Sequence, residues 1–216
     1  MKRSYGSRPF RARRFVKRAT DLLLVVPAFI VLLPLMVVLG LSIRFGAGGP
    51  VLFRQARSGM DGTPFTLLKF RTMNDARGSE GRLLPDGDRL TRLGRFLRRT
   101  SLDELPTLIN VLKGEMSLVG PRPLITDYID RYSPQQLRRL AMRPGITGWN
   151  QINGRNALSW EQKLALDVWY VENWSFWLDI KILAVTAGKV ISGHGVTAPG
   201  NATMPEFMGT ERGEPD

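Results

Sequence analysis

The sequence predicts an α+β fold that is mainly helical, with one N-terminal membrane helix, interfacial amphipathic helices and a small β-hairpin in a single domain. Three observations carry this prediction. They are one long apolar run near the N-terminus, helical periodicity over much of the remainder, and two strand-like runs that flank a turn. With 216 residues, the chain is long enough for one domain with a sizeable core.

The residue types present limit the chemistry that the protein can perform. The chain contains no cysteine, which excludes disulfides, thiolate metal sites and a cysteine nucleophile. Its one histidine, His194, stands in a glycine-rich segment, so a histidine-based triad or a multi-histidine metal site has almost no material. Catalysis would therefore rest on carboxylates, arginine, lysine and hydroxyl groups.

Positive charge is concentrated at the N-terminus. The formal net charge is +12, from 31 Lys and Arg against 19 Asp and Glu, and residues 1–20 form a basic arm without an acidic residue. Such an arm binds anionic membrane surfaces or nucleic acid by the same electrostatic attraction. The apolar run that follows it favours the membrane. The basic residues of the arm are Lys2, Arg3, Arg8, Arg11, Arg13, Arg14, Lys17 and Arg18.

An uncharged apolar run at 22–43 follows the arm. As a helix it would measure roughly 33 Å, enough to reach across the hydrocarbon core of a bilayer. The run is too long for the core of a signal peptide and lacks an A-x-A cleavage site. Pro34 lies near its centre, removes a backbone hydrogen bond and predicts a kink. Because basic residues flank both ends, the pattern permits either a kinked span or a hairpin that returns to the same side.

A β-hairpin and a basic helix are predicted next. Two runs rich in strand-forming residues, 51–55 and 65–71, flank a loop and predict the hairpin. After a polar loop at 74–88, the segment 90–99 places leucine and phenylalanine on one helical face and arginine on the other. Beside a membrane segment, we expect this helix to contact headgroups or phosphates, with an ordinary solvated face as the alternative.

Two further helices and an irregular tail complete the prediction. Ser159 and Gln162 form a capping-box pattern at the start of a helix over 160–172. The apolar run at 176–191 is interrupted by charges, which suits a helix in the membrane interface or on the domain better than a span. Dense aromatic residues near it are typical of an interfacial belt, and a tryptophan-rich core is the alternative. Residues 193–216 are punctuated by glycine and proline and predict an irregular tail.

Two adjacent carboxylates, Asp103 and Glu104, form the first candidate catalytic group. Ser101 and Glu104 fit a capping box, and Pro106 is tolerated only near a first turn, so a helix is predicted to begin between Ser101 and Asp103. The helix dipole would favour ionised carboxylates, and Arg98 upstream would lower their pKa further. An ionised aspartate among cations can act as a nucleophile or a metal ligand, whereas a plain helix cap is the structural alternative.

Three arginines lie in turn-rich segments and are candidates for substrate binding. Arg122 stands between Pro121 and Pro123, whose fixed backbone angles suit it to bidentate phosphate recognition. Arg143 in RPGITGW and Arg155 in NGRN are each combined with turn-forming glycine. These segments are predicted to be loops that wrap around an anionic or sugar-like ligand.

Taken in order, the motifs resemble those of one protein family. They are KRxxD before the apolar run, GPVLFRQ and KFRTM in the predicted hairpin, TSLDELP around the carboxylates, then LKGEMSLVGPRPL and RPGITGWNQINGRN. Over residues 15–190 this series resembles the bacterial sugar transferase family, the monotopic phosphoglycosyl transferases. The chain looks like the small form without extra N-terminal helices, similar to members that transfer diacetylbacillosamine phosphate at the start of bacterial N-linked glycosylation.

The resemblance implies transfer of sugar-1-phosphate from a UDP-sugar to undecaprenyl phosphate with Mg²⁺, through a covalent phosphoglycosyl-aspartate and with release of UMP. Asp103 would be the nucleophile, and Glu104 would assist metal binding or proton transfer, so both are expected metal ligands. Lys69 and Arg98 would contact phosphates and Arg122 the nucleotide. The full set of expected substrate-binding residues is Lys69, Arg71, Arg98, Arg122, Arg143 and Arg155.

The resemblance also implies a topology. The family's membrane segment is a re-entrant hairpin broken at a Ser-Pro pair, whereas Leu33 precedes Pro34 here. We expect residues 21–45 to form a re-entrant membrane helix broken at Pro34. The catalytic domain, residues 46–192, would then lie on the cytoplasmic face of the bacterial inner membrane.

Two other functions are compatible with the same residues. One is a membrane-tethered protein that binds anionic lipid or nucleic acid without catalysis, and the other is an anchored hydrolase that cleaves the diphosphate with water. The expected partners are the UDP-sugar, undecaprenyl phosphate and membrane lipid, with no nucleic acid, and a homodimer stays open. The sequence does not specify the sugar, although diacetylbacillosamine is favoured over N-acetylgalactosamine, galactose or glucose.

Overall fold

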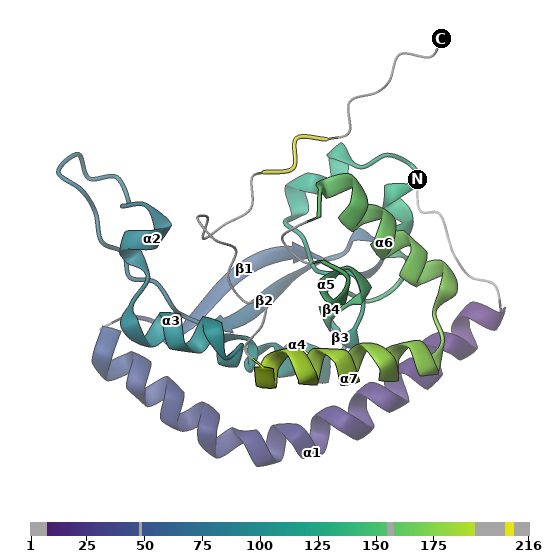
Figure 1. Cartoon of the computed structure of the whole chain (residues 1–216), viewed down its shortest axis with the longest axis horizontal. Coiled ribbons are helices and arrows are strands. Elements are labelled where there is room, and N and C mark those ends of the chain that lie inside the picture. The colour runs from purple at the N-terminus through teal and green to yellow at the C-terminus, as the bar shows by residue number, and fades with distance from the viewer. Residues whose placement is uncertain (1–7, 48, 155–157, 193–205, 210–216) are drawn as a thin grey trace, which may run out of the picture.

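One long helix borders the whole molecule. The computed structural model describes residues 8–47, 49–154, 158–192 and 206–209. In it, α1 (Arg8–Ala47) bows along one side, and the rest of the fold lies on its concave side (Figure 1). The basic arm from residue 8 onward and the apolar run therefore form one continuous helix, with no structural boundary at the predicted position between residues 20 and 21.

The bow of α1 follows from its two prolines. Pro27 and Pro34 lie within the helix and are seven residues apart, close to two full turns, so they occupy the same side. Both are exposed on the outer surface, opposite the domain. Each proline removes a helical hydrogen bond and bends the helix, and bends on one side add. The helix continues through Pro34, so the expected break appears as a bend; whether this segment is re-entrant in a membrane stays a prediction.

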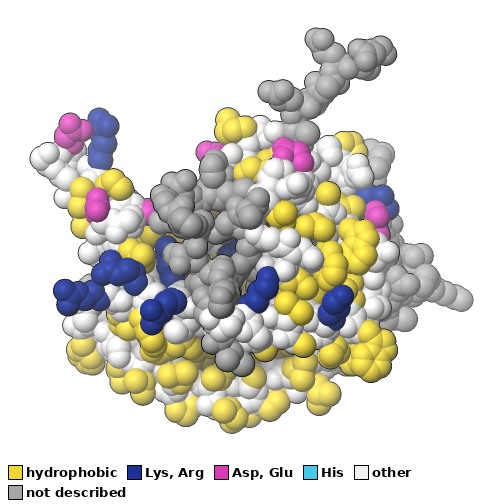
Figure 2. Space-filling view, in the orientation of Figure 1, with side chains coloured by type: hydrophobic (Ala, Val, Ile, Leu, Met, Phe, Trp, Pro, Cys, Tyr) yellow, Lys and Arg dark blue, Asp and Glu magenta, His cyan; other side chains and the backbone are white. Residues whose placement is uncertain are grey.

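The inner face of α1 is part of the hydrophobic core. This face is buried against the domain, and its residues follow one another at intervals of three, four or eleven positions, each close to a whole number of helical turns. They are Val25, Met36, Leu39 and Ile43. The outer face carries exposed apolar side chains that form the lower edge in Figure 2. Within the described residues, α1 is the one helix long and apolar enough to cross a membrane.

The predicted β-hairpin is confirmed. Strands β1 (Leu52–Ser58) and β2 (Pro64–Phe70) pair antiparallel with Leu52 opposite Phe70. A short 3₁₀ turn, η1 (Met60–Gly62), joins them. Leu67 and Phe70 on β2 are buried against α1, which fixes the hairpin to this long helix.

The predicted basic helix is also confirmed. A short helix, α2 (Asp86–Arg89), interrupts the polar loop and precedes α3 (Arg92–Arg99), where the side chain of Thr91 caps the first turn by accepting from the amide of Gly94. Leu97 is buried against α1, but Phe96, expected on the same apolar face, is half-exposed. Arg92, Arg95 and Arg99 are exposed beside it.

A second, parallel strand pair forms the centre of the domain. After a 3₁₀ turn, η2 (Leu102–Glu104), and helix α4 (Thr107–Lys113), strand β3 (Ser117–Val119) pairs parallel with β4 (Gly145–Thr147). The segment around Arg143 was expected to be a ligand-binding loop, but the residues that follow it form this strand. Close backbone approach explains the glycines here, because a Cβ on Gly120 or Gly145 would overlap neighbouring backbone atoms.

The C-terminal half covers this strand pair. Two 3₁₀ turns, η3 (Thr126–Arg131) and η4 (Gln136–Ala141), lead to β4 and the short helix α5 (Trp149–Ile152). Helix α6 (Trp160–Asn173) begins with the predicted capping box of Ser159 and Gln162. Helix α7 (Phe176–Ser192) packs against β3, β4 and α5, is joined to α1 by the ion pair of Asp179 with Lys17, and completes the core with Ile182.

The aromatic residues around α6 and α7 divide between surface and core. Trp169, Phe176 and Trp177 are exposed, as an interfacial belt requires, whereas Tyr170 and Trp174 are buried. The buried part of this segment belongs to the core, and an interfacial belt formed by the exposed part stays a prediction. Of the predicted irregular tail, only residues 206–209 are described; Phe207 packs in a cluster with Tyr128, Tyr132 and Leu164.

Candidate active site

The two carboxylates lie in a tight turn between α3 and α4. Asp103 and Glu104 belong to the 3₁₀ turn η2, which begins at Leu102, within the predicted window. The predicted capping box is absent, because Ser101 adopts a left-handed conformation (φ 57°) and its side chain makes no cap hydrogen bond. This conformation turns the chain from the end of α3 into η2. Pro106 then precedes α4, so the helix dipole starts beyond the carboxylates.

Glu104 is held by cations from two other elements. The Nζ atom of Lys69 on β2 lies 2.5 Å from Oε1 of Glu104, and Nη2 of Arg122 lies 3.6 Å from the same oxygen. Lys69 and Glu104 are each about one-fifth exposed, so this pair faces partly away from solvent. The hairpin, η2 and the loop after β3 thus converge on one carboxylate.

Asp103 is an aspartate whose ionisation is opposed by burial. Burial raises its pKa above the ordinary value, and the neighbouring Glu104 carboxylate adds to that rise. The positive charges of Lys69, Arg98 and Arg122 act in the opposite direction without cancelling the effect of burial. The expectation of a lowered pKa was therefore wrong, because it counted the cations and omitted the desolvation of a folded site.

The positive charges of Arg98 and Arg122 are held in fixed positions near the carboxylates. Arg98, in the last turn of α3, donates from Nε to Oγ1 of Thr72 at 3.0 Å. The backbone oxygen of Arg122 accepts from Nη2 of Arg139 at 2.6 Å, and Arg139 is itself buried in an ion pair with Asp167. The side chain of Arg122 stays 44% exposed, so it is anchored through its backbone and open toward a ligand.

Arg57 belongs to the same site, although it was not among the predicted substrate-binding residues. Burial and the charge of Arg122 lower the pKa of Arg57 to about 10. Its Nη1 donates to the carbonyl of Pro123 at 3.3 Å, and its buried Nε has no hydrogen-bond partner among the described residues. Two arginines held close together despite repulsion favour an anionic ligand between them. Strand alternation could have found Arg57, because it lies across the hairpin from Phe65 on a half-buried strand.

Two of the predicted substrate-binding residues, Arg71 and Arg143, are not brought to this site. Arg71 is paired with Asp75 at 2.6 Å and donates to the carbonyl of Met73. Arg143 donates from Nε to the carbonyl of Gly114 at 2.7 Å. Neither side chain lines a pocket that contains Glu104. Arg155 lies outside the described residues.

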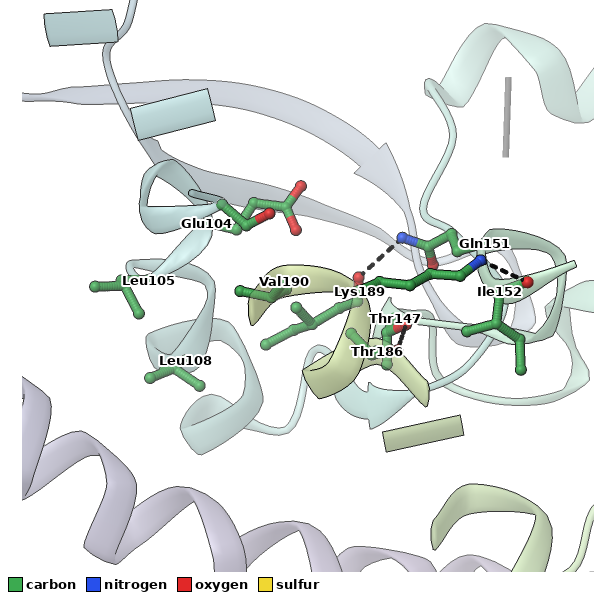
Figure 3. A pocket seen from close by; sticks show the side chains of 11 residues that line it. Glu104, Leu105, Leu108, Thr147, Gln151, Ile152, Thr186, Lys189 and Val190 are labelled. Carbon is green, nitrogen blue, oxygen red and sulfur yellow. Dashed lines mark hydrogen bonds between the residues drawn. The ribbon is translucent and has the colours of Figure 1, made fainter. Parts of the chain in front are cut away.

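Two pockets meet at Glu104. The first, which we call the cationic pocket, has a volume of about 40 Å³. The second, which we call the α7 pocket, has a volume of about 160 Å³ and lies between η2, α5 and α7 (Figure 3). The polar residues of the cationic pocket are Arg57, Lys69, Glu104, Thr107 and Arg122.

The donor set fits a magnesium ion that is completed by substrate. Among the described residues, no group of three or more acidic or histidine side chains gathers to form a closed metal cage. Mg²⁺ is commonly held by one or two carboxylates together with substrate phosphates and water. Glu104 lines the cationic pocket, and the adjacent Asp103 supplies a second carboxylate of that kind.

Comparison with known proteins places this geometry in a family. The model of the bacterial sugar transferase family matches residues 12–193. A Bacillus subtilis protein named "Uncharacterized sugar transferase EpsL" is 57% identical over 168 residues, 78% of this chain and 83% of its own length. The undecaprenyl-phosphate galactose phosphotransferase of Salmonella typhimurium is 40% identical over 202 residues, 86% of this chain and 42% of its own length.

A third relative is covered over more of its length than the Salmonella protein is. The UDP-glucose:undecaprenyl-phosphate glucose-1-phosphate transferase of Caulobacter vibrioides is 40% identical over 186 residues, 82% of this chain and 70% of its own length. This chain thus spans less than half of the Salmonella relative but most of the other two. On the extent of the family match and these identities, the chain belongs to the bacterial sugar transferase family.

Proposed function

We propose that this protein transfers sugar-1-phosphate from a UDP-sugar to undecaprenyl phosphate and releases UMP. The observation that carries the proposal is the Asp103–Glu104 pair set among Lys69, Arg98 and Arg122 at the edge of a cationic pocket. A diphosphate needs cations on several sides, and phosphoryl transfer needs a positioned nucleophile. The names of relatives from Salmonella and Caulobacter supply the two substrate classes.

Asp103 is the proposed nucleophile. Its carboxylate oxygen forms a bond to the β-phosphorus of the UDP-sugar, and the bond from that phosphorus to the bridging oxygen breaks. The electron pair leaves with UMP, and the sugar phosphate remains on Asp103 as an acyl phosphate. Arg122 and Arg57 bind the diphosphate oxygens and stabilise the charge that develops on the leaving group.

The second half of the reaction restores the aspartate. A phosphate oxygen of undecaprenyl phosphate attacks the same phosphorus, a new phosphoanhydride bond forms, and the bond to Asp103 breaks. Asp103 and Glu104 would hold Mg²⁺, which neutralises negative charge on the diphosphate. Lys69 holds Glu104 in place beside the nucleophile through their 2.5 Å ion pair.

The surface of the molecule supports an active site at a membrane. The outer face of α1 is apolar, and the exposed arginines of α3 lie beside it, as the yellow edge and the blue patch above it show (Figure 2). Cationic side chains next to an apolar surface suit an interface with anionic headgroups. We place the protein on the cytoplasmic face of the inner membrane, where UDP-sugars are made.

The test is UMP release by the purified protein in lipid nanodiscs. UDP-glucose, UDP-galactose, UDP-N-acetylglucosamine, UDP-N-acetylgalactosamine and UDP-diacetylbacillosamine are each supplied with undecaprenyl phosphate. We expect one or more to give UMP and a polyprenyl-diphosphate-linked sugar. Release of UMP and free sugar phosphate without acceptor would instead indicate a hydrolase, and no UMP from any donor would indicate a binding protein.

Asp103→Asn tests the covalent step. An amide is not a competent nucleophile, so turnover should be abolished while the variant stays folded. Asp130→Asn is the matched control, because Asp130 is exposed and lies outside both pockets. With donor alone, mass spectrometry of the wild-type protein should detect a sugar-phosphate adduct that Asp103→Asn lacks. Near-normal turnover in Asp103→Asn would overturn the mechanism.

A further inference from the structure

The α7 pocket has a different character from the cationic pocket with which it shares Glu104. Figure 3 shows Glu104, Leu105 and Leu108 on one side, Gln151 and Ile152 on the other, and α7 between them. Its walls are mainly apolar, with a few polar side chains that face the space. This combination is typical of a site for a specific small group. The α7 residues that line it are Thr186, Lys189 and Val190.

Gln151 carries an unmet hydrogen-bond acceptor in this wall. The residue is 8% exposed, and its Nε2 donates to the carbonyl of Ile146 at 3.2 Å, which fixes the orientation of the amide. Its Oε1 is buried and has no hydrogen-bond partner among the described residues. A buried acceptor without a partner destabilises a protein, so such a group at a pocket favours a ligand that donates a hydrogen bond.

The other polar groups of the pocket are held in fixed positions. Oγ1 of Thr147 and Oγ1 of Thr186 form a hydrogen bond of 2.8 Å, which joins β4 to α7. Lys189 extends from α7 across the pocket, and its Nζ donates to the carbonyl of Ile152 at 2.7 Å (Figure 3). An ammonium group has three donors, so this bond uses one of them. The wall is therefore pre-organised before any ligand enters.

We propose that the α7 pocket binds the sugar ring of the nucleotide sugar, and that Gln151 selects the sugar by accepting a hydrogen bond from a ring hydroxyl or amide N–H. The inference rests on the proposed function. The sugar is bonded directly to the β-phosphate, which the neighbour of Glu104 attacks, and Glu104 lines both pockets. If the diphosphate lies in the cationic pocket, the adjoining α7 pocket is the space next to the β-phosphate, where the sugar is attached.

The chemistry of the pocket favours a sugar over the lipid acceptor. The hydrocarbon chain of undecaprenyl phosphate has no hydrogen-bond donor, and its phosphate is an acceptor at neutral pH. Neither satisfies Oε1 of Gln151. Sugars present several hydroxyl donors on a ring whose faces pack against apolar side chains such as Leu105 and Ile152.

The first experiment separates binding of the sugar from binding of the nucleotide. In full-length protein carrying Asp103→Asn, which prevents turnover, the Kd values for UDP and for the best UDP-sugar donor are measured with and without Gln151→Met. Methionine keeps the length of the side chain and removes the acceptor. We expect the Kd of the UDP-sugar to rise roughly tenfold and that of UDP to stay unchanged. Gln135→Met, at an exposed position outside both pockets, should change neither.

The second experiment identifies the hydroxyl. Donor analogues that each lack one ring hydroxyl or the N-acetyl group are compared for kcat/KM in proteins with an intact Asp103. Wild type should lose about tenfold with one analogue, and Gln151→Met should no longer distinguish that analogue from the parent sugar. Thr186→Val provides an independent variant if Gln151→Met does not fold, because it changes another polar wall of the same pocket.

Several outcomes would overturn the assignment. If Gln151→Met and Thr186→Val both leave the ratio of the two Kd values and the selectivity among donors unchanged, the pocket does not hold the sugar. A change confined to the KM for undecaprenyl phosphate would assign the pocket to the acceptor. In both cases the wild-type protein would still release UMP, so failure of this inference is distinguishable from failure of the proposed function, in which no donor gives UMP.

Discussion

At the scale of single residues, Arg122 is fixed more firmly than its exposure suggests. Its neighbours Pro121 and Pro123 restrict the backbone, and the buried Arg139 binds its carbonyl oxygen. Lysine at this position would keep the charge but lose the planar fork that binds two phosphate oxygens. We expect Arg122→Lys to lower kcat/KM, measured by steady-state UMP release. The decrease should correspond to a loss of about 1–3 kcal/mol in transition-state stabilisation. Unchanged kinetics would show that Arg122 only forms the turn.

Arg57 offers a test of the part of the site that the sequence did not reveal. Burial and the nearby charge of Arg122 lower the pKa of Arg57 to about 10. A bound diphosphate would relieve this repulsion, so Arg57→Gln should raise the KM for the UDP-sugar on the order of tenfold. Arg54→Gln is the control, because Arg54 is exposed and an odd number of residues away on the same strand, on its opposite face. Equal kinetics in the two variants would remove Arg57 from the site.

The site residues show which predictions a sequence allows. Asp103, Glu104 and Lys69 lie in motifs whose residues meet in space, and the structure brings them together. Arg71 and Arg143 stand in equally suggestive motifs but bind other partners, Asp75 and the carbonyl of Gly114. The direction of a side chain depends on strand register and neighbouring turns, which a motif does not encode. The raised pKa of Asp103 likewise depends on burial, which only the folded chain defines.

At the scale of elements, the helices and the hairpin were predictable and their curvature was not. Helical periodicity located α3 and α6, an apolar run interrupted by charges located α7, and strand-forming residues on both sides of a turn located the hairpin. The strands β3 and β4 are three residues each, too short to show a period. For α1, the sequence indicated a kink at Pro34, but only the structure shows that the helix continues through both prolines, so that their bends add.

The curvature of α1 leads to a prediction for Pro34→Leu. Leucine restores the missing helical hydrogen bond and straightens the outer half of the helix. A straighter helix would separate Met36, Leu39 and Ile43 from the core that they share with Phe70. We expect a lower Tm in nanodiscs and poor membrane insertion. Leu33→Ala, an exposed neighbour that leaves the proline in place, is the control. A variant with the wild-type Tm and normal insertion would show that the bend is not needed.

At the scale of the whole molecule, residues 14–20 of the basic arm are part of the fold. The sequence suggested an arm available to lipid or nucleic acid, but Arg14 donates to the carbonyl of Ala141 and Arg18 to the last carbonyls of α4. Lys17 is buried, with Nζ 2.6 Å from Asp179 and 3.0 Å from the hydroxyl of Tyr170. These contacts join residues more than 90 positions apart in the chain, beyond the reach of local pattern.

Topology is tested by cysteine labelling, which is convenient because the chain has no native cysteine. A single cysteine is introduced at Ser4 or at Ser79, before and after the membrane segment. If both ends of α1 lie on the cytoplasmic face, an impermeant reagent should label neither position in intact cells and both after lysis. Labelling of Ser4→Cys from outside, with Ser79→Cys protected, would establish a full span.

The burial of one face of α1 means that the anchor cannot be separated from the enzyme. In many membrane proteins a terminal helix is a tether, and its removal leaves a soluble domain. Here a chain shortened past residue 46 would expose the apolar cores beneath Val25 and Ile43 and would leave Asp179 without the ammonium group of Lys17. Removing α1 to obtain a soluble form would therefore unfold the catalytic half. A fusion protein must contain α1 and the domain together.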